Sequence, residues 1–237
     1  MKYDVLVIAG TTESRQVIEE ELKKGHSVLA SVATDLGAEM LRDYDIDIQV
    51  GRLDEQGFIS LLTDNPCGEI IDASHPFAVI VTETVRRAAK RLGIPYHRYA
   101  RTEIQYDYQN IFQVEDVEEA VALLNQIEGN ILLTTGANTA AVYAKGVKRA
   151  VDRVFVRVLD TPASYEACAR AGYPADHVIG EMPPYDLEDN LRLIRQLDAR
   201  VMVSKDSGRT GGVDVKVEAC RQAGIPMILI ARPHSWN

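Results

Sequence analysis

The feature that most constrains the fold is a regular alternation of short apolar runs and amphipathic segments along most of the 237 residues. Residues 3–9 have the length and composition of a buried strand, and residues 13–24, which end at Gly25, have the periodicity of a helix. Strands that alternate with helices in this way form βαβ units. The sequence therefore predicts an α/β fold with Rossmann-like parallel sheets.

The alternation continues on both sides of a polar, aromatic stretch at residues 100–110, which has no clear period. We therefore predict two closely joined α/β domains, residues 1–100 and 101–237, with a ligand cleft between them. One continuous sheet is the alternative. Further strands are predicted at 27–33, 46–50, 69–73, 96–99, 130–134, 153–158, 177–179, 200–204 and 227–231. Further helices are predicted at 36–42, 53–62, 77–92 (capped by Gly93), 114–127, 138–145, 163–171, 186–197 and 213–223.

Composition excludes several classes of protein. With 26 basic and 35 acidic residues the net charge is −9, which opposes non-specific binding to nucleic acid or an anionic membrane surface. No uncharged run approaches the roughly 18–20 residues that span a bilayer, and the N-terminal apolar run is too short for a signal peptide. Three separated cysteines and five scattered histidines favour the cytoplasm and predict no dedicated metal site. No pattern fixes an oligomeric state.

The loop after the first strand is a candidate cofactor site. Gly10, Thr11, Thr12 and Glu13 lie where a doubly wound fold binds phosphate with backbone N–H groups and the helix dipole. The loop departs from the GxGxxG fingerprint, because Thr12 and Arg15 occupy the second and third glycine positions. Helix capping by Thr11 or Thr12 therefore remains the alternative to dinucleotide binding.

Thr34 and Asp35 follow the second strand, where an acidic residue binds the ribose hydroxyls of an adenosine. A carboxylate there would repel a 2′-phosphate, so Asp35 favours NADH over NADPH. The alternative is that Asp35 caps the next helix.

Ser74 and His75 follow the strand at 69–73 and, like Gly10, belong to the carboxyl edge of the predicted sheet. His75 could bind substrate or cofactor, or donate a proton near neutral pH. Pro76 suits the first turn of the following helix. A purely structural role in the loop is the alternative for His75.

Two strand ends in the second half resemble anion-binding turns. Thr135 and Gly136 follow one strand, and the loop that contains Lys205, Ser207, Gly208 and Arg209 follows another. Glycine loops that carry Lys and Arg suit carboxylates or phosphates, although this loop is no Walker A motif. A solvated surface loop is the alternative.

Arg98 and Arg101 at the predicted domain junction, and Arg232 after the last strand, are candidate carboxylate clamps. Each alone could be an ordinary surface charge. Taken with Lys205 and Arg209, they point to a polyanionic substrate.

Together these loops resemble the precorrin-6A reductase family of cobalamin (vitamin B12) biosynthesis, including its cobalt-precorrin-6A branch. The resemblance covers residues 3–233, and its most specific parts are the segment from Ile71 to Ala78 and the segment from Val203 to Gly208. The Gly10–Arg15 loop, Tyr99-Ala100-Arg101, Leu133-Thr134-Thr135-Gly136 and Arg232-Pro233 also match. Family members often have two glycines where this chain has Ala9-Gly10.

The resemblance implies a pyridine nucleotide, NADPH or NADH, on the first Rossmann-like domain and the anionic tetrapyrrole in the cleft, with the second domain contributing to that cleft. The implied reaction is hydride transfer that saturates one C=C bond of precorrin-6A to give precorrin-6B. His75 and Lys205 are the candidate proton donors beside solvent. Cations near the macrocycle would assist hydride acceptance.

Two other functions stay open. A short-chain dehydrogenase or epimerase usually needs a Tyr-x-x-x-Lys pair, and no tyrosine here has a lysine four residues later. A non-catalytic tetrapyrrole-binding protein would keep the cleft without needing a nucleotide. The reductase hypothesis also requires that the cations Arg98, Arg101, Lys205, Arg209 and Arg232 converge, because the chain as a whole is acidic.

Overall fold

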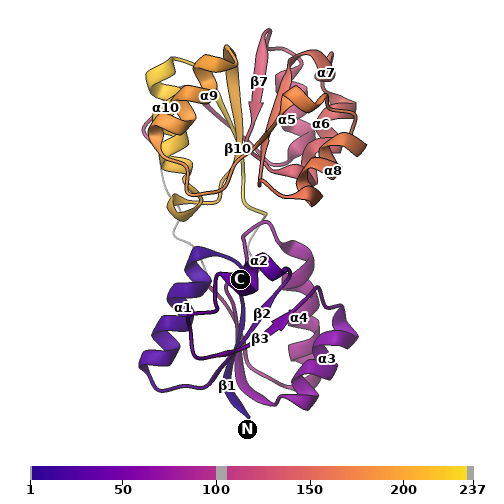
Figure 1. Ribbon diagram of the computed structural model, residues 1–237, viewed down its shortest axis with the longest axis vertical. Helices are drawn as coiled ribbons and strands as arrows, with labels where there is room; N and C mark the ends of the chain where they lie inside the picture. Colours follow the sequence, from indigo (N-terminus) through magenta and orange to yellow (C-terminus); the bar gives the residue numbers. More distant parts are fainter. Residues whose placement is uncertain (1, 100–105, 234–237) are drawn as a thin grey trace. The chain divides into compact units, whose positions relative to one another are not determined.

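The computed structural model describes residues 2–99 and 106–233 and divides the chain into two compact units, residues 1–102 and 103–237 (Figure 1). Arg101, one of the predicted clamps, lies outside the described residues. Each unit contains its own parallel sheet, so the fold is α/β with two Rossmann-like sheets, as the sequence predicts. Within the described residues, no helix combines the length and apolarity that a membrane crossing requires.

The first unit is a five-stranded parallel sheet in the order β3-β2-β1-β4-β5. Its strands are β1 (Tyr3–Ile8), β2 (Val28–Val32), β3 (Asp47–Val50), β4 (Cys67–Asp72) and β5 (Tyr96–Arg98). Its helices are α1 (Thr12–Lys23), α2 (Asp35–Glu39), α3 (Glu55–Asp64) and α4 (Val79–Leu92). Gly93 caps α4 in the left-handed conformation at φ +68°, as predicted.

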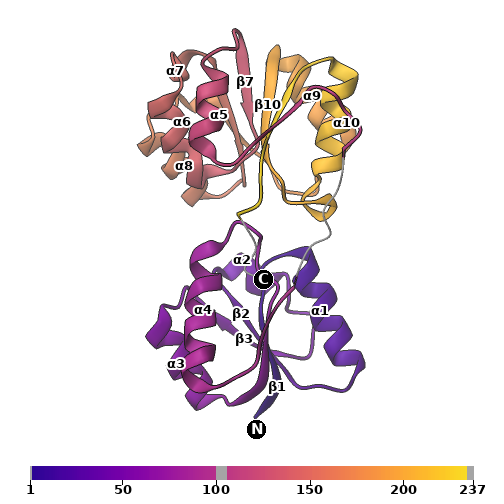
Figure 2. The same ribbon diagram turned by 180° about the vertical axis from the view of Figure 1, so that it is seen from behind.

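Helices cover both faces of this sheet, so its central strands are apolar along nearly their whole length. Leu6, Ile8 and Ile70 pack with α3 and α4 on one face, while Val5 and Val7 pack with α1 on the other. Figures 1 and 2 show α1 on the opposite side of the sheet from α3 and α4. This two-sided burial explains why the run at the start of the chain has no polar alternation.

The second unit is a six-stranded parallel sheet in the order β6-β11-β10-β7-β8-β9. Its strands are β6 (Ile111–Val114), β7 (Asn130–Leu133), β8 (Val154–Val158), β9 (Val178–Gly180), β10 (Ala199–Lys205) and β11 (Met227–Ile230). Its α-helices are α5 (Val117–Leu124), α6 (Ala140–Gly146), α7 (Ala150–Arg153), α8 (Pro162–Arg170), α9 (Leu187–Gln196) and α10 (Val213–Ala223). Short 3₁₀ turns are η1 (Ala137–Thr139), η2 (Ala175–His177) and η3 (Arg209–Gly211).

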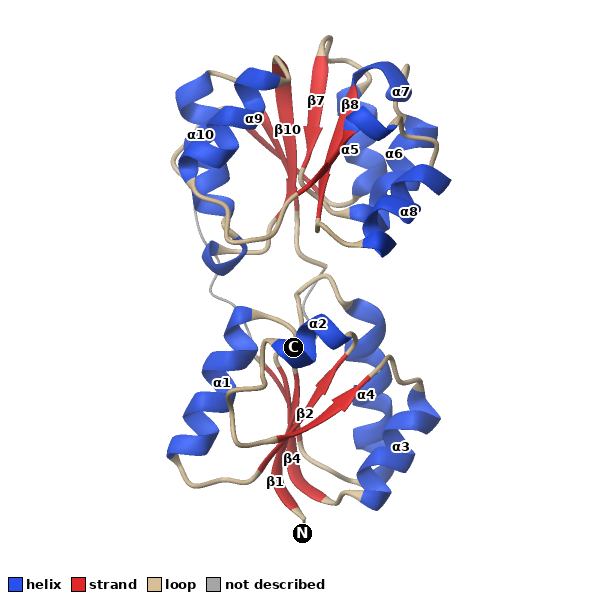
Figure 3. Ribbon diagram, in the orientation of Figure 1, coloured by secondary structure: helices blue, strands red, loops and turns tan. Residues whose placement is uncertain are grey.

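In this unit α9 and α10 cover one face of the sheet and α5, α6 and α8 lie on the other (Figure 3). Leu132, Met202 and Leu229 form a buried cluster with residues of α9 and α10. Both faces are again closed to water, which leaves the strand ends as the places where polar loops can gather.

Both sheets contain a switch point, where consecutive strands lead away in opposite directions. In the first unit β1 and β4 are the neighbours at this point, and in the second unit β7 and β10 are. Ligands of open parallel sheets bind beyond the carboxyl ends of such strand pairs. The loops after β1, β4, β7 and β10 are among those that the sequence predicts to bind ligands.

Three details differ from the sequence prediction. The prediction has no strand at β6, because this edge strand is only partly buried and lacks a continuous apolar run. It also places residues 77 and 78 in a helix, whereas α4 begins at Val79 and Pro76 precedes it in a turn. Finally, the short helix α7 lies where the sequence has no clear helical period.

Candidate functional site

The loop after β1 is closed by a capping box. The Thr11 hydroxyl accepts a hydrogen bond from the Ser14 N–H (3.0 Å), and the Ser14 hydroxyl accepts from the N–H groups of Gly10 and Thr11 (3.1 Å each). Thr11 is thus the N-cap that the sequence offered as one alternative. Thr12 is exposed and Glu13 is buried in the first turn of α1. The amide of Thr12 begins the helix and has no partner within it.

Gly10 allows a ligand to approach the backbone closely. Its φ of +115° lies in the region that disfavours side chains, and a Cβ built there would meet no atom within 4 Å. The open space lies beside the start of α1, where the helix dipole favours an anion. The space at Gly10 fits a dinucleotide phosphate, even though the hydroxyls of Thr11 and Ser14 already accept from three amides of this turn, those of Gly10, Thr11 and Ser14.

Thr34 and Asp35 lie at the start of α2. The Thr34 hydroxyl accepts a hydrogen bond from the Gly37 N–H (3.2 Å), so Thr34 is the N-cap of α2. The alternative role of Asp35 as the cap of this helix is therefore wrong. Asp35 is the first helical residue and is exposed. Its carboxylate is therefore available to a ligand at the carboxyl edge of β2.

At the end of β4 the carboxylate of Asp72 is completely buried. Its Oδ1 accepts from the Ser74 N–H (3.0 Å) and pairs with Arg98 Nη1 (2.5 Å). Its Oδ2 accepts from the hydroxyls of Thr82 and Tyr96 (2.8 Å each). Four donors from the following loop, α4 and β5 thus surround one carboxylate. Burial next to this carboxylate raises the pKa of Tyr96 far above its usual value.

Arg98 connects Asp72 to the loop that contains His75. Its Nη1 donates to the Ser74 hydroxyl (2.8 Å), and its Nη2 donates to the carbonyls of Ser74 and His75 (3.2 Å each). The side chain is only 16% exposed. The role that the sequence predicts for Arg98, a clamp on a substrate carboxylate, stays a prediction, but most of its donors are used inside the first unit.

The imidazole of His75 has a defined orientation. Its Nδ1 accepts a hydrogen bond from the Phe77 N–H (3.2 Å), which assigns the proton of the neutral ring to Nε2. The Phe77 ring lies beside it, with 5.9 Å between centroids. The Thr11 hydroxyl donates to the Ala73 carbonyl (2.9 Å), so the loops after β1 and β4 contact each other at the switch point.

In the second unit, the loops after β7 and β10 are neighbours because β7 and β10 pair directly. Thr135 is buried and accepts a hydrogen bond from the Thr139 hydroxyl (2.9 Å), and Gly136 has a φ of +80°. Lys205 ends β10, and burial lowers the pKa of its ammonium group. The structure therefore places Thr135, Gly136 and Lys205 at one edge of one sheet.

The rest of the β10 loop turns back on itself. Ser207 and Gly208 are buried, and Arg209 is exposed at the start of η3. The Gly208 N–H donates to Asp206 Oδ1 (3.3 Å), and Arg232 Nε donates to the Asp206 carbonyl (3.0 Å). Arg232 therefore holds this loop to the end of β11, and it is 16% exposed.

Two buried cations lie behind the β10 loop. Lys216 of α10 donates to the Ser204 hydroxyl (3.2 Å) and to the Gly211 carbonyl (3.4 Å). Burial, together with nearby Arg157, lowers the pKa of Lys216 to about 7. Arg157 lies on the ring of Tyr185 (4.0 Å), but neither of its Nη atoms has a hydrogen-bond partner.

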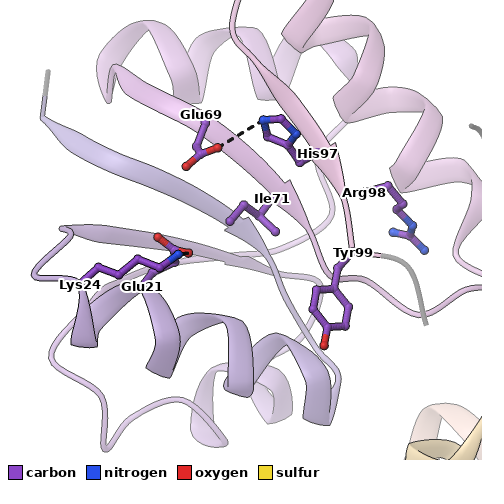
Figure 4. Close-up of a pocket in the computed structure, with 7 residues that line it drawn as sticks. All are labelled: Glu21, Lys24, Glu69, Ile71, His97, Arg98 and Tyr99. Atoms are coloured by element: carbon purple, nitrogen blue, oxygen red, sulfur yellow. Dashed lines mark hydrogen bonds and ion pairs between the residues drawn. The ribbon is translucent and has the colours of Figure 1, made fainter. Parts of the chain in front are cut away.

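A shallow groove lined by residues of α1, β4 and β5 is a weaker candidate for a ligand site (Figure 4). Its charged side chains are paired with one another: Lys24 contacts Glu21 at 2.6 Å, and His97 contacts Glu69 at 3.4 Å. In Figure 4 the guanidinium of Arg98 points away from these pairs. A groove whose charges are already matched offers little to a charged ligand. Across the residues that the structure describes, no cluster of three or more His, Cys, Asp or Glu could hold a metal ion.

The predicted site residues thus form two groups. Residues of the first group all belong to the carboxyl edge of the first sheet: Gly10, Thr11, Thr12, Glu13, Thr34, Asp35, Ser74, His75 and Arg98. Residues of the second group belong to the same edge of the second sheet: Thr135, Gly136, Lys205, Ser207, Gly208, Arg209 and Arg232. That the cations of both groups converge on one ligand stays a prediction.

Asp72, Thr82 and Tyr96 are functional candidates that the sequence pattern does not reveal. The sequence does contain one signal for Asp72: an acidic residue at the end of an otherwise buried strand needs a partner that compensates its charge. The identity of that partner was not available, because Arg98 lies 26 residues further along the chain.

Comparison with known proteins agrees with these observations. The profile of the family described as "Precorrin-6x reductase CbiJ/CobK" matches residues 4–237. A cobalt-precorrin-6A reductase of Priestia megaterium is 34% identical over 230 residues, which cover 97% of this chain and 90% of that protein. One from Methanothermobacter thermautotrophicus is 33% identical, covering 98% of this chain and 77% of that protein. A solved structure described as "CobK precorrin-6A reductase" superposes with a TM-score of 0.80 at 22% identity, covering 99% of this chain and 90% of that one.

Proposed function

Because the chain belongs to the precorrin-6x reductase family, we propose that it reduces one C=C bond of the precorrin-6A macrocycle to give precorrin-6B in cobalamin biosynthesis. It is an oxidoreductase that acts on a CH–CH group. The observation that best supports a site for this reaction is the contact between the loops after β1 and β4. There Thr11 holds Ala73, beside Gly10 and His75.

A nicotinamide nucleotide, when bound, supplies the hydride; the protein binds and orients it. The open space at Gly10 and the start of α1 would hold its phosphates, and Thr34 and Asp35 would lie at its ribose. Ser74 and His75, one strand further along the same edge, would then face the reacting end. This assignment makes the first unit the nucleotide-binding unit.

The second unit would bind the anionic macrocycle. Thr135 and Gly136 supply a turn with positive φ, and Arg209 supplies an exposed cation. Ser207 and Gly208 belong to the same loop, which Asp206 and Arg232 hold in place, and would line the site next to carboxylates of the substrate. Arg101 would add a further cation.

The reduction also requires a proton at the macrocycle. His75 is one candidate: its Nε2–H points away from the Phe77 amide and can hydrogen-bond a ligand at the sheet edge, and the imidazolium form of the ring would be the acid that gives up the proton. Lys205 is the second candidate, because burial lowers the pKa of its ammonium group toward the range in which it can act as an acid. Solvent remains a third source.

The direct test is an anaerobic assay that follows nicotinamide absorbance. We expect oxidation of NADPH or NADH only when precorrin-6A or its cobalt-containing form is added. The relatives from Priestia megaterium and Methanothermobacter thermautotrophicus are both cobalt-precorrin-6A reductases, which favours the cobalt-containing form. Absence of oxidation with both nucleotides and both macrocycles would refute the proposal. Macrocycle binding without nucleotide binding would instead favour a non-catalytic binding protein.

The choice between NADH and NADPH is tested at Asp35. If its exposed carboxylate faces the ribose, Asp35→Ala should relax discrimination against NADPH by about tenfold, since removing the carboxylate removes about 1.4 kcal/mol of repulsion. The ratio of kcat/KM for the two nucleotides measures this effect. An unchanged ratio would mean that Asp35 serves only the first turn of α2.

Arg101 is tested in the same assay. Arg101→Ala should raise the KM for the macrocycle several-fold, on the order of 1 kcal/mol for one lost charge-assisted contact, and leave the KM for the nucleotide unchanged. The opposite pattern would place Arg101 on the nucleotide.

A further inference from the structure

Asp72, at the end of β4, has a completely buried carboxylate. A buried charge costs several kcal/mol unless donors surround it, so the groups around Asp72 are what make its burial possible. The donors are the Ser74 N–H, the hydroxyls of Thr82 and Tyr96, and the guanidinium of Arg98. All four lie within 3.0 Å of a carboxylate oxygen.

The two carboxylate oxygens have different neighbours. Oδ2 accepts from Thr82 of α4 and Tyr96 of β5, which belong to the regular scaffold. Oδ1 receives the Ser74 amide and Arg98. One oxygen is thus anchored to the scaffold, and the other holds the loop that follows β4.

Arg98 extends the reach of the carboxylate along this loop. With one nitrogen on Asp72, its guanidinium donates to the carbonyls of Ser74 and His75 at 3.2 Å each. A planar guanidinium offers its donors in a fixed geometry, so fixing Arg98 at one edge also fixes the carbonyls at the other. The backbone on both sides of the Ser74–His75 peptide is therefore set by Asp72.

We propose that Asp72 is a positioning residue: through Arg98, its buried carboxylate fixes the backbone of Ser74 and His75, and with it the direction of the His75 ring. The catalytic part of this proposal rests on the function proposed above, which puts His75 beside the reacting groups. The conformational part rests only on the contacts of the first unit.

The charge of Asp72, and not only its shape, is required. All four neighbours of the carboxylate are donors, and each oxygen accepts two of them. An asparagine loses the charge that pairs with Arg98 whichever way its amide turns. With its NH₂ group toward Ser74 and Arg98 it meets two groups that can only donate, and with its NH₂ group toward the hydroxyls of Thr82 and Tyr96, which can also accept, its neutral oxygen attracts Arg98 less. Asp72→Asn is therefore a nearly isosteric change that should loosen the hold on Arg98.

The nucleotide loop should be affected less than His75. It contacts this network through a neutral hydrogen bond, from the Thr11 hydroxyl to the Ala73 carbonyl (2.9 Å). Its own capping box at Ser14 is independent of Asp72. A positioning role for Asp72 thus predicts a loss in kcat and little change in nucleotide affinity.

Steady-state kinetics of Asp72→Asn test this split. We expect kcat to fall about 10- to 100-fold, the range caused by a misplacement of about 1 Å, while the KM for the nucleotide changes less than about threefold. The matched control is Asp4→Asn, whose carboxylate accepts from the Ser27 amide (2.8 Å) and hydroxyl (2.7 Å) at the opposite edge of the sheet. Its kcat should equal that of the parent protein.

A spectroscopic measurement tests the same link without substrate. In ¹⁵N-labelled protein, His75 should show the Nε2–H tautomer, because Nδ1 accepts from the Phe77 amide. In Asp72→Asn the ring should become a mixture of tautomers, while in Asp4→Asn it should not change. Tyr96→Phe retains the charge of Asp72 and removes one of its donors, so it should shift the tautomer ratio in the same direction by a smaller amount. It is the second variant to measure in case Asp72→Asn does not fold.

These measurements separate the two proposals. An unchanged His75 tautomer in both Asp72→Asn and Tyr96→Phe, or an unchanged kcat in a folded Asp72→Asn, would overturn the positioning role. If the parent protein oxidises no nucleotide with either macrocycle but the tautomer shifts as expected, the proposed function fails and the link from Asp72 to His75 stands.

Discussion

In the first unit the buried charge next to the switch point is a carboxylate, whereas in the second unit it is an ammonium group. Asp72 ends β4 and accepts from Thr82 of α4. Ser204 of β10 occupies a similar place in the second unit and accepts from Lys216 of α10. Apart from β6, the second sheet repeats the strand order of the first, and the charges buried beside the equivalent ends of β4 and β10 have opposite signs.

The two charges also differ in how completely they are paired. Asp72 has four donors, including the cation Arg98. Lys216 has two neutral acceptors and a second cation, Arg157, nearby. The nearest carboxylate to Arg157 is 3.9 Å away, on Glu181. The buried charge of the first unit is thus fully paired, whereas these two buried cations of the second unit have neutral or more distant partners.

The largest expected effect comes from breaking the complete network. Arg98→Leu leaves Asp72 buried without its cation, so the first unit should lose about 3–5 kcal/mol of stability. Hydrogen exchange of the β4 and β5 amides measures this loss within one unit. The control is Arg87→Leu, which breaks an exposed pair with Glu55 and should cost about 1 kcal/mol or less. Equal losses would mean that the Asp72 network contributes no more than a surface ion pair.

The next effect concerns Lys216 and pH. Its pKa is about 7 in the folded state, well below its usual value of about 10.4, so the unfolded chain binds more protons between these values. The stability of the parent protein should therefore rise as pH increases from 7 to 10. Below pH 7 both states are protonated, and the full cost of burying the charge is present.

Lys216→Met removes this dependence. The variant should be more stable than the parent by about 2–3 kcal/mol at pH 6, and this advantage should shrink toward pH 10. Urea unfolding at several pH values measures the difference. A difference that does not vary with pH would contradict the lowered pKa.

A smaller effect compares two glycines with similar backbone strain. Gly10 (φ +115°) and Gly136 (φ +80°) both have open space where a Cβ would lie. Changing either to Ala should cost about 1–3 kcal/mol of stability. Only Gly10→Ala should also weaken NAD(P)H binding, by about tenfold or more, because the methyl group would enter the proposed phosphate site. Equal nucleotide affinities in the two variants, measured by calorimetric titration, would move the nucleotide away from Gly10.

The smallest effect is expected at Arg157. Its two Nη atoms have no hydrogen-bond partner, and Glu181 keeps a closer partner in Arg192 (2.6 Å). Arg157→Met should therefore change stability by about 1 kcal/mol or less, in contrast to Arg98→Leu. It should also raise the pKa of Lys216, because a nearby like charge is removed. A loss as large as that of Arg98→Leu would show that Arg157 is paired as completely as Asp72.

The fold could be predicted because burial on both faces leaves a continuous apolar signature in strands such as β1 and β7. β6 could not, because Phe112 and Gln113 are exposed at the edge of the sheet and its pairing with β11 joins residues more than a hundred positions apart. The start of α4 is also later than predicted, since long-range contacts from Arg98 hold the carbonyls of Ser74 and His75, directly before the turn at Pro76 and Phe77.

For the candidate site, the sequence identified loops but not their internal partners. Strand ends in a parallel sheet are predictable places for ligands, so Gly10 and His75 could be selected from position alone. The hydrogen bonds of Arg98 to Ser74 and of Arg232 to Asp206 depend on tertiary contacts between distant strands. Residues that support a site from behind are therefore harder to predict than residues that face it.

The position of β6 has a consequence for biosynthesis. The five strands of the first sheet are all present once Arg98 has been translated, whereas β6 pairs with β11, which begins about 113 residues after β6 ends. At a synthesis rate of roughly 5–20 residues per second, β6 waits about 6–23 s for this neighbour. During that interval β6 has no β11 to pair with, whereas all five strands of the first sheet have already been synthesised. The two sheets can therefore be completed only at different stages of translation.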